Sequence, residues 1–149
     1  MVNLNISVYM ATRCNIGILD GDGGITGIYV HWDGYPEHSG KMLLNHYMDP
    51  GYIYELMDLG DLSCIAENVY SVGKHSFNDP EPKVCVAYGR DRGEKDVESR
   101  YFEDIGEFEE FGRNTGSDYQ YLFDNGVWTY RNVRNGGWKV LTAEVCGGK

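Results

Sequence analysis

A short polar and aromatic loop holds the densest group of residues that can contact a ligand. The loop and the helix start that follows it contain His31, Trp32, Asp33, Tyr35, His38 and Lys41. Two aromatic rings in such a loop can stack on nucleobases, which favours binding by about 1–3 kcal/mol per base. The histidines can donate to phosphate oxygens or act as acid and base, and the N–H groups of a first helical turn can hold a phosphate. The alternative is a structural loop, in which Trp32 and Tyr35 pack on a sheet and Asp33 caps a turn.

A basic segment, from Tyr88 to Glu94, is the second candidate in an otherwise acidic chain. Arg90 and Arg92 have the spacing of side chains on one face of a strand, and two guanidinium forks there suit a phosphate. The alternative is that Asp91 and Glu94 neutralise both arginines in surface ion pairs worth under about 1 kcal/mol. One more arginine, near the first expected strand, supplies a third cation. The predicted ligand-binding residues are Arg13, His31, Trp32, Asp33, Tyr35, His38, Lys41, Tyr88, Arg90 and Arg92.

The spacing of the candidate residues does not indicate a metal site or a catalytic site. The residues of suitable type near the loop are His31, Asp33, Glu37, His38 and His46. On a helix, His38 and His46 would lie about 12 Å apart along the axis and could not share a metal. The chain has no HxH, HExxH or CxxC motif, no GxSxG elbow and no Walker loop. A calcium loop starting at Asp20 fails because its twelfth position is His31 instead of glutamate. We therefore expect no metal, no cofactor and no catalytic residues.

The net charge narrows the class of partner. Lys and Arg number 13 against 23 Asp and Glu, a net charge of −10. Duplex DNA and anionic membranes demand a basic face, so neither is expected as a partner. A small anionic ligand needs only two or three placed cations and stays compatible. Seven of the acids lie in residues 96–110, which predicts either a solvated face or a surface that occupies a basic protein.

Length and cysteine content predict one cytoplasmic domain spanning residues 1–149. Domains usually have about 100–200 residues, and the chain has 149. Its four cysteines stand among apolar or small residues, which is typical of buried free thiols in a reducing compartment. We find no signal peptide and no apolar run near the roughly 18 residues of a membrane span.

Hydrophobic periodicity and turn residues predict an α+β fold. Strands are expected over 4–10, 14–19, 25–31, 84–88, 119–123, 127–131 and 138–145. Helices are expected over 38–49, 52–59 and 96–110, with a further helical turn at 61–65 and a loop or strand extension at 89–94. Gly60 is expected to stop the second helix. The hairpins expected near the two ends of the chain favour an antiparallel sheet with two or three short helices packed on one face.

A family resemblance covers most of residues 11–130. The string Tyr29-x-His31-Trp32-Asp33-Gly34-Tyr35-Pro36 resembles a motif of small, mostly phage-encoded proteins. Other matching positions are Thr12-Arg13, Asn15-Ile16, Gly40, Leu43-Leu44, Tyr47, Leu59 to Ser63, Tyr88, Arg90 to Glu94 and the hairpin from Tyr119 to Trp128. By a looser analogy, small phage proteins often counter host immunity, and one group acts as sponges for cyclic-nucleotide signals of CBASS or Thoeris systems. This resemblance implies a viral, cytoplasmic protein of immune evasion.

The leading hypothesis is a non-enzymatic sponge for a cyclic di- or trinucleotide or a cyclic ADP-ribose type of signal. Two base stacks and three charge-assisted bonds at about 2 kcal/mol each give about 10 kcal/mol. Association costs at least about 4 kcal/mol, and the remaining 6 or so corresponds to a Kd between millimolar and micromolar. Tight capture therefore predicts a homo-oligomer, a dimer or tetramer, with a pocket shared by two chains. The alternatives are an acidic inhibitor of a host defence protein and a cyclic-nucleotide hydrolase that uses His31 and Asp33.

Overall fold

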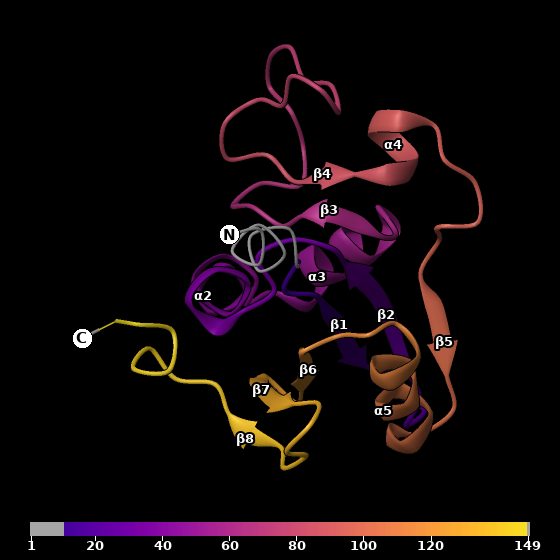
Figure 1. Ribbon diagram of the computed structural model, residues 1–149, viewed down its shortest axis with the longest axis vertical. Coiled ribbons are helices and arrows are strands. Elements are labelled where there is room, and N and C mark those ends of the chain that lie inside the picture. Colours follow the sequence, from indigo (N-terminus) through magenta and orange to yellow (C-terminus); the bar gives the residue numbers. More distant parts are fainter. Residues whose placement is uncertain (1–10, 149) are drawn as a thin grey trace, which may run out of the picture.

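A mixed sheet of eight strands forms the centre of the computed structural model, which describes residues 11–148 (Figure 1). The strands are β1 (Cys14–Leu19), β2 (Ile25–Val30), β3 (Leu62–Cys64), β4 (Val86–Ala87), β5 (Arg100–Phe102), β6 (Tyr119–Asp124), β7 (Val127–Asn132) and β8 (Lys139–Val140). Their order is β4-β3-β2-β1-β6-β7-β8, and β5 pairs with β2. The sheet and its helices confirm the predicted α+β class.

Strand direction differs from the prediction of an antiparallel sheet. The two expected hairpins, β1–β2 and β6–β7, are antiparallel. However, β1 pairs with β6 in parallel, and β2 pairs with β3 in parallel. Parallel neighbours need a long crossover connection, and no local turn signal reveals that such strands will meet. The sheet is therefore mixed.

Helices cover both faces of this sheet, instead of the single face predicted. The helical segments are η1 (Pro36–Gly40, a π-helical turn), α2 (Lys41–His46), α3 (Pro50–Asp58), α4 (Tyr88–Arg92) and α5 (Ile105–Asn114). Ile53 of α3 belongs to the core cluster that contains Ile16 of β1. Phe108 of α5 belongs to a second cluster with Ile25 of β2. Successive strand residues point to opposite faces, so β1 and β2 contribute to both clusters.

Three local predictions are wrong. Residues 61–65 contain strand β3 instead of a helical turn, and residues 89–94 overlap helix α4 instead of a loop. The acidic segment 96–110 divides into β5 and the start of α5, which begins only at Ile105. The side chain of Asp104 accepts a hydrogen bond from the N–H of Glu107 at 2.9 Å, an N-cap that sets this start.

The chain ends also differ from expectation. The last strand is shorter than predicted, since β8 spans only Lys139–Val140 within 138–145. The expected strand at 4–10 lies outside the described residues. The four cysteines are free, as predicted. Among residues 11–148, no helix combines the length and apolarity that a bilayer crossing requires.

Gly60 stops α3 as predicted. It follows the C-cap residue Leu59 and adopts φ +74°, in the left-handed region that favours glycine. A Cβ atom at this position would lie 2.3 Å from the carbonyl oxygen of Val97. Glycine is thus required here both by conformation and by the close passage of the segment that leads to β5.

Candidate functional site

The loop after β2 is held in place by the ends of neighbouring strands. The N–H of Trp32 donates to Ser63 O at 2.9 Å, and the N–H of Gly34 donates to Thr12 O at 2.8 Å. Asp33 adopts φ +58°, and its carbonyl oxygen accepts a 2.7 Å bond from the Ser39 hydroxyl. The rings of Trp32 and Tyr35 remain 41% and 37% exposed. The loop is therefore a fixed element that presents two aromatic rings to solvent.

His31 contacts both Tyr29 and Trp32 and lies near the charge of Arg13. The ring centroids of His31 and Trp32 are 4.8 Å apart in an edge-to-face arrangement. Nδ1 of His31 lies 2.7 Å from the Tyr29 hydroxyl. Burial, followed by the charge of Arg13, lowers the pKa of His31. These residues form a neutral aromatic patch beside one cation at neutral pH.

Asp33, Tyr35 and His38 gather instead around a residue that the sequence did not single out, Cys64. The Tyr35 hydroxyl donates to Asp33 Oδ1 at 3.1 Å. Cys64 Sγ lies 3.6 Å from His38 Nε2 and 4.0 Å from Asp33 Oδ2. No spacing signal could have found Cys64, because it approaches the loop only through the parallel pairing of β2 and β3.

This cluster is poorly arranged for nucleophilic catalysis by Cys64. Burial raises the pKa of its thiol to about 12, with a further increase from the charge of Asp33, and the thiol is not the reactive form. Nε2 of His38 lies 2.9 Å from the backbone oxygen of Ile65, which can only accept, so Nε2 carries the proton. The basic nitrogen is then Nδ1, and Nε2 cannot take the proton of the thiol.

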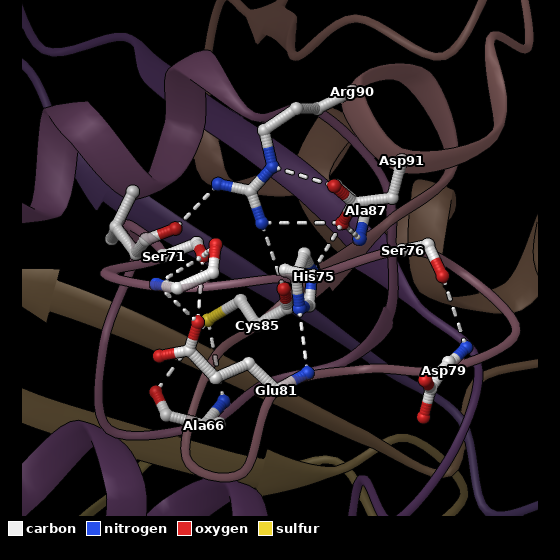
Figure 2. Close-up of polar contacts among 12 residues, drawn as sticks. Ala66, Ser71, His75, Ser76, Asp79, Glu81, Cys85, Ala87, Arg90 and Asp91 are labelled. Atoms are coloured by element: carbon white, nitrogen blue, oxygen red, sulfur yellow. Dashed lines mark hydrogen bonds and ion pairs between the residues drawn. The ribbon is translucent and has the colours of Figure 1, made fainter.

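The guanidinium of Arg90 is occupied by groups of its own chain, although the side chain is 31% exposed (Figure 2). Its Nε donates to Asp91 Oδ1 at 2.8 Å, and its terminal nitrogens donate to the carbonyl oxygens of Val69 and Cys85, the latter at 2.8 Å. His75 lies 3.1 Å from the same Asp91 carboxylate. This network ties α4 to the segment between β3 and β4, so the Arg90 guanidinium is occupied by structure.

Arg92 does not share a face with Arg90, because both lie on helix α4 and the predicted strand spacing does not apply. It forms an ion pair with Glu94. Its guanidinium lies over the rings of Phe77 and Tyr88, at 4.2 and 5.1 Å from the centroids. Tyr88 thus contacts a cation of its own chain. Both arginines are thus paired with acids of the same segment, as the alternative expected. The Arg92–Glu94 pair lies at the surface, whereas the Asp91 carboxylate is buried.

Lys41 is separate from the loop residues. It begins α2 and lines a small hollow of about 50 Å³ with Cys146 and Ala143. The ten predicted residues are therefore distributed over several places: an aromatic patch, a cluster at Cys64, the α4 region and the C-terminal segment.

A larger groove lies beside Tyr35 and was not predicted as a site. Two adjoining hollows, of about 480 and 370 Å³, share Tyr119 and Asn132 in their walls. Ligand pockets commonly measure about 300–1,000 Å³. We call this the tyrosine groove, and its defining residues are Tyr35, Tyr119, Tyr130, Asn132, Arg134 and Lys139.

Strand alternation places the tyrosines of the groove. Tyr119 pairs with Asn132, and Tyr121 pairs with Tyr130, so these side chains share one face of the β6–β7 hairpin. Tyr121 is fully buried beneath the loop and donates to Gly34 O at 2.7 Å. Tyr119 and Tyr130, nearer the edge of the same face, stay partly exposed.

Charges of both signs border the groove. Arg134 and Lys139 are exposed, and neither forms an ion pair with any residue of 11–148. Glu37 and Asp118 contribute carboxylates to the walls. Such a groove can receive a ligand that has an anionic part and a part with N–H donors.

Comparison with protein-family models, with curated proteins and with solved structures gives no significant match.

Proposed function

We propose that this protein binds a small anionic ligand of the cyclic-oligonucleotide class in the tyrosine groove and holds it without cleaving it. The observation that carries this proposal is the combination of three tyrosine rings with two cations that have no ionic partner in the described chain. Base-on-aromatic stacking is worth about 1–3 kcal/mol per base. Arg134 and Lys139 supply charge-assisted bonds to phosphate.

The carboxylates in the groove suit the same ligand class. Glu37 and Asp118 would repel a simple anion such as phosphate, but they can accept hydrogen bonds from exocyclic amino groups of bases. A nucleotide offers phosphate and base N–H groups in one molecule. Mixed charge therefore favours a nucleotide over an inorganic anion.

Sequestration as an immune-evasion role extends this proposal. The groove of a single chain leaves a ligand open to solvent on one side. We propose that a second copy covers the ligand in a homo-oligomer. Two base stacks and three charge-assisted bonds alone would give a Kd only between millimolar and micromolar. The proposed setting is the cytoplasm of an infected bacterium, where the ligand would be a cyclic immune signal.

The double variant Arg134→Ala/Lys139→Ala is expected to weaken binding of a cyclic dinucleotide at least about 100-fold. Each lost bond to a charged group removes about 1.5–3 kcal/mol, and 1.4 kcal/mol corresponds to a factor of about ten. Isothermal titration calorimetry of the full chain against a panel of cyclic di- and trinucleotides measures the effect.

The matched control is Lys74→Ala/Lys95→Ala, which removes the same charge from exposed positions outside the groove. Its affinity should stay within about twofold of wild type, because distant surface charges are largely screened. Equal losses in both double variants would mean that only net charge matters. No binding to any member of the panel would refute the proposal.

A further inference from the structure

We propose that Asp33, His38 and Cys64 form a binding site for Zn²⁺. Three elements bring them together: the loop after β2 supplies Asp33, η1 supplies His38 and β3 supplies Cys64. One donor atom from each residue lies within 4.8 Å of the other two. This inference is independent of the proposed nucleotide function, because none of the three residues lines the tyrosine groove.

One separation between donor atoms matches tetrahedral zinc, and a second is a few tenths of an ångström too long. With Zn–S near 2.3 Å and Zn–N near 2.0–2.1 Å, a tetrahedral angle separates the two donor atoms by about 3.6 Å. Cys64 Sγ and His38 Nε2 are 3.6 Å apart. Cys64 Sγ and Asp33 Oδ2 are 4.0 Å apart, so these two atoms must approach each other by a few tenths of an ångström to bind one zinc ion.

The donor set selects the class of metal. A thiolate with an imidazole and one carboxylate suits Zn²⁺, whereas Mg²⁺ and Ca²⁺ prefer oxygen donors alone. Three protein ligands leave a fourth position for water or a ligand group. All three residues are partly exposed, so an ion can reach the site.

Surrounding groups orient the ligands. The Tyr35 hydroxyl donates to Asp33 Oδ1 and leaves Oδ2 towards Cys64. Ser39 holds the backbone of Asp33 at a positive φ that few non-glycine residues adopt. Nε2 of His38 donates to Ile65 O at 2.9 Å in the structure, so coordination through Nε2 must break this bond and move the imidazole proton to Nδ1. The contacts of Tyr35 and Ser39 orient Asp33, as outer contacts of metal ligands commonly do.

Cobalt substitution tests the site in the full, reduced and chelator-stripped protein. One equivalent of Co²⁺ should produce the visible bands of a tetrahedral ion and a near-ultraviolet thiolate-to-cobalt band, and Zn²⁺ should displace both. Cys64→Ser should abolish the thiolate band, and His38→Gln and Asp33→Asn should weaken Co²⁺ binding at least tenfold. Tyr35→Phe, which removes only an outer contact, should weaken it about tenfold.

Two controls complete the test. Cys146→Ser and His46→Gln remove the same residue types away from the cluster and should leave the cobalt spectrum unchanged. The proposal would be overturned by a thiolate band that survives Cys64→Ser, or by the absence of any band with excess Co²⁺. Native mass spectrometry with Zn²⁺ gives a second measurement of metal binding. Arg134→Ala/Lys139→Ala should keep the cobalt spectrum, which separates this proposal from the nucleotide proposal.

Discussion

Replacing Asp91 with alanine is expected to lower the free energy of unfolding by about 3 kcal/mol, because it removes a buried carboxylate that accepts several hydrogen bonds, and bonds to charged groups are worth about 1.5–3 kcal/mol each. The Asp91 side chain is 5% exposed and accepts bonds from Arg90, from His75 and from the N–H of Ala87. Its loss leaves the buried His75 and part of the Arg90 guanidinium without an acceptor (Figure 2). Urea unfolding followed by circular dichroism measures the change.

Glu94→Ala is the matched control for Asp91→Ala. Glu94 pairs with Arg92 at side chains that are 38% and 49% exposed, and exposed pairs contribute under about 1 kcal/mol. If both variants lost equal stability, the network around Asp91 would not hold α4 to the segment between β3 and β4.

Acid should weaken the same network. Burial acts to raise the pKa of Asp91, but hydrogen bonds from Arg90, Ala87 and His75 outweigh it and hold the pKa below the ordinary value. A carboxyl group with a lowered folded-state pKa contributes stability above its unfolded pKa, and that stability is lost as the pH falls through the folded pKa. The stability difference between wild type and Asp91→Ala should therefore shrink in acid.

Gln120→Leu is the second large effect, with an expected loss of about 3 kcal/mol. Gln120 is fully buried; its Nε2 donates to Asn15 Oδ1 at 2.9 Å and to Phe108 O at 2.6 Å. Its Oε1 accepts from Nε of Arg131, which is 4% exposed, at 2.9 Å. Leucine removes that acceptor and leaves a buried guanidinium nitrogen unpaired, and bonds to charged groups are worth about 1.5–3 kcal/mol each.

The control for Gln120→Leu replaces an exposed amide. Asn45→Leu, an exposed amide-to-leucine change on α2, is the control and should stay within about 0.5 kcal/mol of wild type. Thermal and urea unfolding compare the two. A Gln120→Leu protein as stable as Asn45→Leu would show that Arg131 finds another acceptor.

Local signals predicted those parts of the fold that depend on neighbouring residues. Asn125 and Gly126 have φ of +50° and +87°, the positive values that a two-residue hairpin turn requires and that Asn-Gly supplies. Gly60 likewise stops α3. The parallel β1–β6 pairing was missed because the partner strands lie far apart in the chain.

The candidate site was harder to predict for a related reason. The loop from His31 to Tyr35 was found from residue types alone, yet its neighbours come from distant strands. The pairing of β3 with β2 brings Cys64 near the loop, and the pairing of β6 with β1 brings Tyr119 near it. Arg90 and Arg92 were assigned strand spacing, but the segment is helical, and acids adjacent in sequence engage both guanidinium groups.

The acidic surface hypothesis is constrained by two glutamates of α5 that already have structural contacts. Glu109 accepts from Nε1 of Trp138 at 2.8 Å, and Glu107 accepts from the N–H of Glu103 at 2.9 Å. Charge reversal there would change local packing as well as charge. Glu110, which is exposed, is the cleaner position for testing contact with a basic protein.

Mass spectrometry of released ligand tests the central claim most directly. The full chain is incubated with a mixture of cyclic di- and trinucleotides, separated from free ligand and denatured by heat. We predict that one cyclic species is released intact from wild type and is strongly depleted from Arg134→Ala/Lys139→Ala. Release of no nucleotide, or release of a linearised product, would contradict a protein that captures its ligand without cleaving it.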